Sequence, residues 1–297
     1  MYDQICIHKS QSRSSVKQIK TCSELPGLSM TMNIFGHEWA LADLRAMAAE
    51  FVATTLFCYV GCGVAVSTQV FATLDSTGNL DDAFLMSVAL AFGSAITVLA
   101  YTIAPWSGAH MNPAVTFAFW LLQKMNLAQF IQYVMMQMLG AVLGVSLVWG
   151  TFQIDGVKNP PFLLGSNSVH PHATLGSAFL GEVMGTFLLV WTVLMTVVNN
   201  KSMAGNVAPI AVGWSVMLAH LLLIPITGCG INPARSFGSH LVSLCAGEKV
   251  FVDGWWIFYS APFVGSALAV ALCLKVFQVS AKTTKEEGED EKPEQPL

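Results

Sequence analysis

Six long apolar stretches constrain this chain more than any other feature of its sequence. They occupy residues 45–67, 83–104, 127–149, 174–198, 207–226 and 255–278. An α-helix needs about 20 predominantly apolar residues to cross the hydrocarbon core of a bilayer, so each stretch is long enough to span a membrane. Only 11% of the 297 residues are charged, and more than half of these lie before the first stretch or after the last. We therefore expect an all-α membrane protein with six transmembrane helices.

The distribution of lysine and arginine predicts how the spans are oriented. Six spans place both termini on the same side of the membrane, and cytoplasmic segments carry an excess of basic residues. The basic residues on the side of the termini are Lys9, Arg13, Lys17, Lys20, Arg45, Lys124, Lys201, Lys275, Lys282, Lys285 and Lys292. The opposite loops contain only Lys158 and Lys249. Both termini are therefore expected to be cytoplasmic.

The chain divides into a membrane domain and two polar ends. Residues 1–40 form an N-terminal arm and residues 281–297 an acidic tail, and both are expected to be flexible. Residues 41–280 form the membrane domain. A net charge of −4 does not suggest nucleic-acid binding. The sequence contains no readable metal-ligand spacing and no nucleophile–base arrangement, so we expect neither a cofactor, nor a metal, nor an enzyme.

One motif occurs twice, at matching places in the two halves of the chain. GAHMNPAVTF (108–117) lies between spans two and three, and GCGINPARSF (228–237) lies between spans five and six. Glu50 and Glu182 also match, because each stands near the start of the first span of its half. Three spans separate the copies, so the halves must insert in opposite orientations. The sequence therefore predicts an inverted repeat, with one copy in about 41–150 and the other in about 174–280, and a functional site near the bilayer midplane.

Each Asn-Pro-Ala stretch predicts the start of a short helix that enters the membrane without crossing it. Asparagine is a good N-cap, and proline is favoured at the first helical position. The predicted half-helices are 113–122, capped by Asn112, and 233–243, capped by Asn232. Their N-termini should meet near the centre, where two partial positive charges repel cations and two side-chain amides offer donors. The residues of the two triplets are Asn112, Pro113, Ala114, Asn232, Pro233 and Ala234.

At residues 40–280 the sequence resembles the aquaporins of the major intrinsic protein family. The resemblance rests on the two motifs and the two glutamates, and it is strongest to the plasma-membrane intrinsic proteins of plants and their algal relatives. It implies six tilted helices, two half-helices, a homotetramer in the plasma membrane with one pore in each protomer, and passive conduction of water. It also implies a selectivity filter made of Phe92, His220, Cys229 and Arg235. Ser236 and His220 match water-selective members rather than glycerol-conducting ones.

The resemblance also suggests supporting roles for other residues. Glu50 and Glu182 are expected to accept hydrogen bonds from the re-entrant backbone, and a proton relay is the alternative. His110 is expected to contribute a carbonyl and a local hydrogen bond. Cys229 would be a thiol that reacts with mercurials. His240 departs from relatives, which usually have a small residue at that position.

Two further readings of function stay open, and one form of gating is not expected. The second hypothesis is a channel for a broader set of small neutral solutes, such as hydrogen peroxide, ammonia or glycerol. A coupled secondary transporter is the alternative from another class.

Plant relatives close their pore with a long cytoplasmic loop that contains an acid-sensing histidine, whereas the loop here, VNNKSMAGN (198–206), is short and has none. We therefore expect that cytosolic acid does not gate this protein through that loop.

Overall fold

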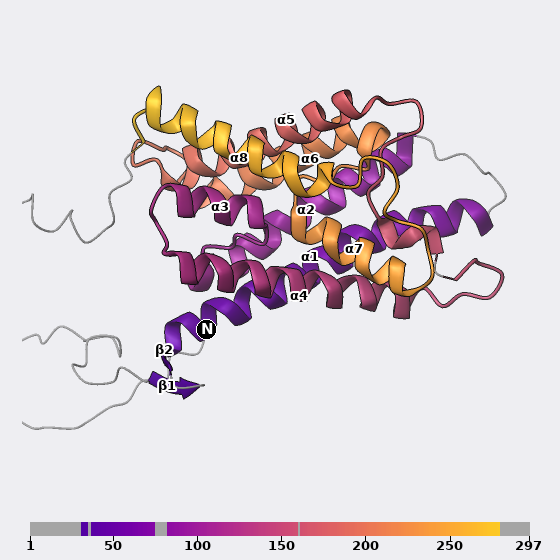
Figure 1. The fold of residues 1–297 in the computed structure, drawn as a ribbon, viewed down its shortest axis with the longest axis horizontal. Helices are drawn as coiled ribbons and strands as arrows, with labels where there is room; N and C mark the ends of the chain where they lie inside the picture. Colours follow the sequence, from indigo (N-terminus) through magenta and orange to yellow (C-terminus); the bar gives the residue numbers. More distant parts are fainter. Residues whose placement is uncertain (1–30, 35–36, 75–81, 160, 280–297) are drawn as a thin grey trace, which may run out of the picture. The chain divides into compact units, whose positions relative to one another are not determined.

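The computed structural model describes residues 31–34, 37–74, 82–159 and 161–279 (Figure 1). The chain separates into residues 1–41 and residues 42–297. In the first unit, strands β1 (Thr31–Ile34) and β2 (His37–Ala40) pair antiparallel, with Thr31 opposite Ala40. The sequence did not predict this hairpin. The rest of the predicted flexible arm and the acidic tail 281–297 lie outside the described residues.

The second unit contains the six long apolar helices that the sequence predicts. They are α1 (Leu41–Leu74), α2 (Asp82–Ser107), α4 (Leu127–Thr151), α5 (Leu175–Val193), α6 (Ala208–Thr227) and α8 (Ile257–Lys275). The π-helical turn η3 (Leu194–Val198) continues α5. All six are long and apolar enough to cross a membrane. The largest difference from the prediction is α1, which extends beyond 45–67 at both ends.

Two shorter helices complete the predicted architecture. Helix α3 (Pro113–Leu121) and helix α7 (Pro233–Cys245) each begin at the proline of an Asn-Pro-Ala triplet. Figure 1 shows them toward opposite ends of the helical unit, with α3 near the last turns of α8. Helix α7 runs two residues past its predicted end, and α3 stops one residue short of its predicted end. The prediction of six spans and two half-helices is confirmed.

Close helix crossings occur in equivalent pairs, as an inverted repeat requires. Helices α2 and α6 cross at Gly93 and Gly213, where a Cβ atom on Gly93 would lie 2.7 Å from the carbonyl oxygen of Gly213. A Cβ on Gly140 of α4 would lie 2.5 Å from the carbonyl oxygen of Phe51 on α1. In the same way, a Cβ on Gly265 of α8 would clash with the carbonyl oxygen of Val183 on α5. Phe51 and Val183 each directly follow one of the two repeated glutamates.

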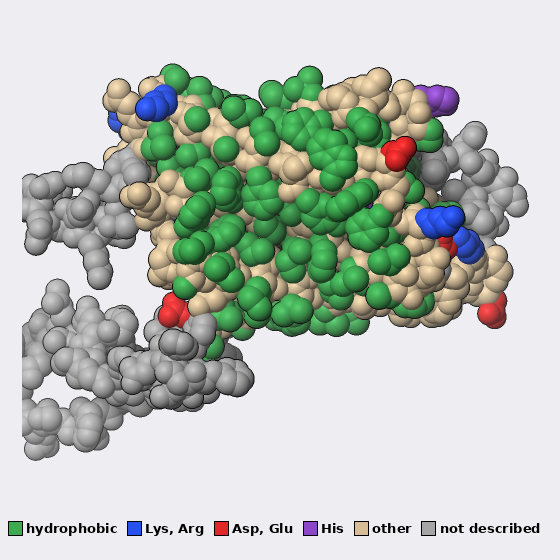
Figure 2. All heavy atoms as spheres, in the orientation of Figure 1, with side chains coloured by type: hydrophobic (Ala, Val, Ile, Leu, Met, Phe, Trp, Pro, Cys, Tyr) green, Lys and Arg blue, Asp and Glu red, His purple; other side chains and the backbone are tan. Residues whose placement is uncertain are grey.

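The outer surface of the helical unit matches a lipid environment. In Figure 2 apolar side chains cover the broad middle of this unit, and charged side chains lie toward its two ends. Exposed apolar side chains occur on every long helix, for example Leu90, Leu180, Trp214 and Leu222. An apolar surface this extensive is unfavourable in water and favourable against acyl chains.

A third short element, η2 (Pro161–Gly165), lies in the connection between α4 and α5. Phe162, Leu163 and Leu164 all have φ between 47° and 50°, a left-handed conformation that is costly for residues with a Cβ. The turn is held from outside, because Ser243 Oγ of α7 donates to the Leu163 carbonyl at 2.6 Å and Leu164 is buried. The α4–α5 connection is therefore fastened to α7.

Candidate pore

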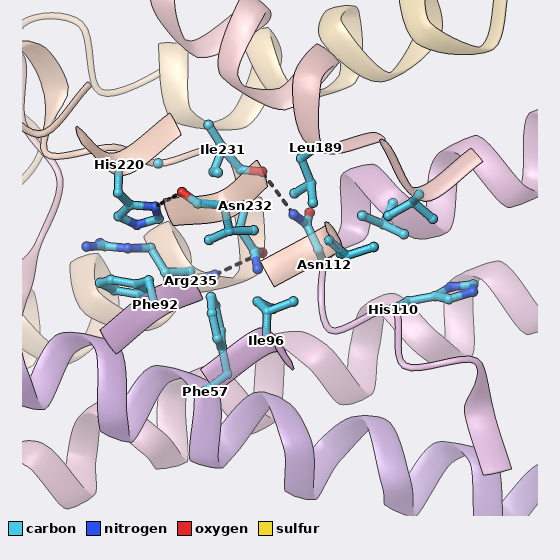
Figure 3. Close-up of a pocket in the computed structure, with 15 residues that line it drawn as sticks. Phe57, Phe92, Ile96, His110, Asn112, Leu189, His220, Ile231, Asn232 and Arg235 are labelled. Atoms are coloured by element: carbon cyan, nitrogen blue, oxygen red, sulfur yellow. Dashed lines mark hydrogen bonds between the residues drawn. The ribbon is translucent and has the colours of Figure 1, made fainter. Parts of the chain in front are cut away.

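The two half-helices meet tip to tip, and their asparagines bind each other's repeat (Figure 3). Asn112 Nδ2 donates to the carbonyl oxygen of Ile231 at 2.9 Å, and Asn232 Nδ2 donates to that of Met111 at 2.8 Å. Met111 and Ile231 are the residues directly before the two asparagines. The junction between the repeats is therefore a reciprocal pair of hydrogen bonds.

Each asparagine also caps its own half-helix. Asn112 Oδ1 accepts from the amide of Ala114 at 2.9 Å. Asn232 Oδ1 accepts from the amides of Ala234 and Arg235 at 3.0 and 3.3 Å. A carboxamide nitrogen has two N–H donors, and one is used across the repeat. The second N–H of each asparagine is without an acceptor in the described part of the chain, and both asparagines line the central cavity.

The backbone before the two asparagines has the same unusual conformation in both copies. The residues four, three and one positions before the asparagine all have positive φ. These are Gly108 (81°), Ala109 (58°) and Met111 (49°) in the first copy, and Gly228 (73°), Cys229 (54°) and Ile231 (42°) in the second. Backbone of this kind inside a membrane has to be buried in protein or line a water-filled space.

A buried carboxylate holds the first of these segments. Glu50 Oε1 accepts from Ser107 Oγ at 2.7 Å and from the amide of His110 at 2.9 Å. Its Oε2 accepts from the amide of Met111 at 2.7 Å and from Gln137 Nε2 at 2.8 Å. All four lone-pair positions of the carboxylate are thus used inside the protein.

The second carboxylate does the same in the other repeat. Glu182 Oε1 accepts from Thr227 Oγ1 at 2.6 Å and from the amide of Gly230 at 2.8 Å, and Oε2 accepts from the amide of Ile231 at 2.6 Å. The two amides lie two and one positions before the asparagine, as in the first copy. Both carboxylates are therefore anchors of re-entrant backbone in this geometry.

Three of the four predicted filter residues come together on the α7 side of the asparagines. The rings of Phe92 and His220 stack with centroids 4.4 Å apart, and the guanidinium carbon of Arg235 lies 5.2 Å from the centroid of Phe92. Figure 3 shows the three side chains grouped on one side of Asn232, with His110 beyond Asn112 on the other side. All three filter side chains are buried.

The hydrogen bonds of the filter determine what it can offer to a passing molecule. His220 Nδ1 lies 2.8 Å from the carbonyl oxygen of Val216, which can only accept, so Nδ1 carries the proton and Nε2 of the neutral ring is an acceptor. His220 Nε2 and Arg235 Nε are buried and unpaired within the described residues. The predicted filter residues therefore present one unpaired acceptor and one unpaired charged donor beside the central cavity that they line.

Three cavities lie in series through the helical unit. The central one, of about 30 Å³, is lined by Phe92, His220, Arg235 and both asparagines, and it has room for one or two water molecules. A cavity of about 370 Å³ shares Arg235 with it and is bounded by Phe162 of the α4–α5 connection. A cavity of about 360 Å³ shares His110 with it and opens beside Asn206. Two wide vestibules thus lie on either side of one narrow central cavity.

Comparison with known proteins identifies the family. The family model described as "Major intrinsic protein" matches residues 38–273. The chain belongs to the major intrinsic protein family. It is 39% identical over 243 residues to "Aquaporin PIP2-7" of Arabidopsis thaliana, covering 80% of this chain and 82% of that protein. It is 39% identical to "Aquaporin-1" of Sus scrofa, covering 77% and 80%.

A solved structure shares the fold of this major intrinsic protein. The aquaglyceroporin from Plasmodium falciparum aligns with a TM-score of 0.70 and 28% sequence identity, over 79% of this chain and 97% of that one. With its six apolar helices, this major intrinsic protein is an integral membrane protein, and it is a channel rather than an enzyme. The names of the relatives include both aquaporins and an aquaglyceroporin, so the range of solutes is a separate question.

Two predicted site residues of this major intrinsic protein lie differently from the central group. Cys229 is fully buried and, within the described chain, lines none of the three cavities, although Gly228 and Gly230 on either side do. His110 lines both the central cavity and the vestibule on the α3 side, and its Nδ1 lies 3.2 Å from Thr116 Oγ1.

Three polar residues that hold the site of this major intrinsic protein were not predicted from its sequence. Gln137 of α4 donates to Glu50 and, at 2.9 Å, to Thr116 Oγ1. Ser266 of α8 donates to the Ala114 carbonyl at 2.7 Å. Asn167 of the α4–α5 connection accepts from Arg235 Nη1 at 2.6 Å. Gln137 is the glutamine nearest the middle of its apolar span, a depth at which a polar side chain is costly and signals a function, whereas nothing in the local sequence marks Asn167.

Proposed function

We propose that this protein is a passive, water-selective channel that excludes protons, ions and larger solutes. The observation that carries the proposal is the reciprocal pairing of Asn112 and Asn232, which leaves one N–H of each amide directed to the same small cavity. A water molecule there accepts from both donors with its oxygen, so its hydrogens point away along the passage. It cannot at the same time accept a proton from the next water in the file, and a continuous proton relay is broken.

Electrostatics supports the exclusion of cations. The N-termini of α3 and α7 each carry about half a positive charge, and both face the central cavity. Arg235 adds the full positive charge of its guanidinium. Lys158 and Glu248 form the only ion pair within the described residues, so no carboxylate contacts Arg235 directly there, and Glu182 acts on its charge only from a longer distance. Half-helix dipoles and a pore arginine are known means of excluding protons and cations.

Size supports the exclusion of larger solutes. The stacked rings of Phe92 and His220 occupy one side of the filter, and Gly61 leaves the space that the Phe92 ring needs. The central cavity of about 30 Å³ is smaller than a glycerol molecule requires. His110 and Gly230 line the same cavity, and their carbonyl oxygens accept no hydrogen bond from any described residue, so both remain acceptors for water.

The test is transport by the purified protein in liposomes. Stopped-flow light scattering under an osmotic gradient should show water permeability well above that of protein-free liposomes. Glycerol and proton fluxes should stay near the protein-free value. The broader channel is the second candidate, because the similar solved structure is that of an aquaglyceroporin. Glycerol flux comparable to water flux would favour it. Flux that saturates or follows a proton gradient would favour a coupled transporter.

Assembly and orientation are part of the same proposal. The relatives include plasma-membrane intrinsic proteins, and we place this chain in the plasma membrane as a homotetramer with one pore in each protomer. The positive-inside rule places both termini in the cytoplasm, so the vestibule beside Asn206 is cytoplasmic and the one beside Phe162 is external. Multi-angle light scattering in detergent tests the tetramer, and protease protection of tagged termini tests the orientation.

A further inference from the structure

The guanidinium of Arg235 is held by a residue outside the half-helix on which it stands. Asn167 is 2% exposed, and its Oδ1 accepts from Arg235 Nη1 at 2.6 Å and from Ser236 Oγ at 2.8 Å. The other contacts of the guanidinium are longer, namely Ser239 Oγ at 3.3 Å and the face of Phe92. The Asn167 amide is thus the shortest contact that fixes the charged group at the filter.

Asn167 is in turn held by a buried histidine. His240, on α7, is 0% exposed, and its Nε2 lies 2.9 Å from the carbonyl oxygen of Asn167. Its Nδ1 lies 2.9 Å from the hydroxyl of Tyr259 on α8. A carbonyl only accepts, so Nε2 donates to Asn167, and Nδ1 of the neutral ring then accepts from the Tyr259 hydroxyl. Both ring nitrogens of His240 are used.

The contacts form one chain, Tyr259–His240–Asn167–Arg235, that runs from α8 through α7 to the α4–α5 connection and back to the filter. Regular structure in that connection is limited to η2 among the described residues, so the place of Asn167 depends on contacts from outside. His240 supplies one directly to the Asn167 backbone. The side-chain amide is held as well by Ser236 Oγ at 2.8 Å and, at 3.5 Å, by the Thr227 carbonyl, so His240 is the anchor of the Asn167 backbone among these contacts.

We infer that Asn167 and His240 are positioning residues that set the width of the filter by fixing Arg235. The inference rests on the proposed function, since it assigns the residues that maintain selectivity in that channel. Neither residue touches the permeating molecule in this account. His240 acts through Asn167, and Asn167 acts through the guanidinium. Loosening the chain of contacts should admit larger solutes while water still passes.

The experiment measures the ratio of glycerol to water permeability in proteoliposomes. Asn167→Ala should raise this ratio by about tenfold or more, because it removes a hydrogen bond to a charged group, and His240→Leu should raise it by about three- to tenfold, because it removes a hydrogen bond between neutral groups. His240→Gln keeps an N–H that can donate to the Asn167 carbonyl, so its ratio should stay near the wild-type value. Tyr259→Phe removes only the hydrogen bond to His240, the one farthest from Arg235 in this series of contacts, and should raise the ratio by about threefold. Tyr59→Phe is the matched control, because Tyr59 bonds Thr151 instead.

Each outcome decides the inference. A wild-type ratio in His240→Leu overturns it, and so does a His240→Gln variant that admits as much glycerol as His240→Leu. If His240→Leu cannot be recovered from membranes, Tyr259→Phe decides, and an unchanged ratio there overturns the inference. The proposed function is tested separately by the water permeability of the wild type. A wild type without water flux contradicts the channel, whereas a conducting channel with unaltered ratios contradicts only the positioning role.

Discussion

Asn112 and Asn232 each donate a hydrogen bond to the carbonyl oxygen of the residue directly before the other, at 2.9 and 2.8 Å. The two half-helices are therefore joined at their N-termini without a covalent bond. The same two amides cap their own helices and keep a further N–H toward the central cavity. Helix capping and assembly of the repeats therefore depend on the same two side chains, to which the proposed function adds contact with the permeating molecule.

Replacing either asparagine by aspartate tests this shared role. Asn232→Asp keeps an oxygen that can cap α7 but loses both N–H donors, and it leaves the Met111 carbonyl facing a carboxylate. We expect a loss of about 1–3 kcal/mol in the free energy of unfolding, together with a large fall in water permeability. Thermal unfolding in detergent and stopped-flow measurements check the two effects. Asn199→Asp is the control, since the side chain of Asn199 accepts from Lys201 N through its oxygen, which aspartate keeps. Equal behaviour of the two variants would contradict the account.

The role of Glu50 and Glu182, as structural anchors or as proton carriers, distinguishes a channel from a coupled transporter. Each carboxylate accepts hydrogen bonds from two consecutive backbone amides, one through each oxygen. In a glutamine one of these oxygens becomes an NH2 group, which would face a backbone N–H donor with no acceptor between them. Glu50→Gln and Glu182→Gln should both destabilise the fold, by about 1–3 kcal/mol each. Wild-type water flux should not respond to a proton gradient. A stable Glu182→Gln variant that abolished proton-dependent flux would support a relay instead.

Removing the imidazole from the filter should widen it. His220→Gly deletes the ring that stacks on Phe92, so glycerol permeability should rise by about tenfold or more relative to water. Leu222→Gly on the same helix is the matched control, because it introduces the same backbone freedom at a lipid-facing position. Glycerol flux that stays at the protein-free level in His220→Gly would show that the constriction lies elsewhere.

Inhibition by mercury ions tests whether the thiol of Cys229, beside the predicted filter, can be reached from the pore. Cys229 lies in the second re-entrant segment with φ of 54°, and it is fully buried between two glycines that line cavities. We predict that mercury ions inhibit water flux and that Cys229→Ser abolishes this inhibition. Cys245, which is exposed, provides the control variant Cys245→Ser. Inhibition that persists in Cys229→Ser would assign the reactive thiol to another cysteine.

The short connection between α5 and α6 bears on gating by acid. It contains no histidine, and Tyr101 of α2 donates to the Asn206 carbonyl at 2.8 Å, which ties the connection beside the vestibule. We expect water permeability to be unchanged when the pH on this side is lowered to mildly acidic values. A collapse of permeability that disappears after changes confined to 198–206 would contradict this expectation.

The helices and half-helices could be predicted because their signals are local. Apolar length identifies the spans, and Asn-Pro identifies the start of α3 and α7. The repeat then implies that the two tips meet. The β1–β2 hairpin, the left-handed turn at Phe162–Leu164 and the contacts of Asn167 could not be predicted in this way. They depend on segments that the fold brings together over long sequence distances.

His240 illustrates the boundary between the two kinds of feature. The sequence marks it as unusual for the resembled family, but its meaning depends on Asn167, 73 positions earlier, and on Tyr259, 19 positions later. A pattern within one helix cannot reveal such a bridge. The structure supplies both partners, and their chemistry then fixes which ring nitrogen donates.

Simultaneous measurement of osmotic water flux and proton flux, in liposomes containing the purified protein, shows whether the pore conducts water without protons. We expect fast water flux with a low activation energy and a proton flux equal to that of protein-free liposomes. Proton flux that rises in proportion to water flux would contradict it, because two donors and a fixed charge at the centre of the passage should interrupt any proton relay.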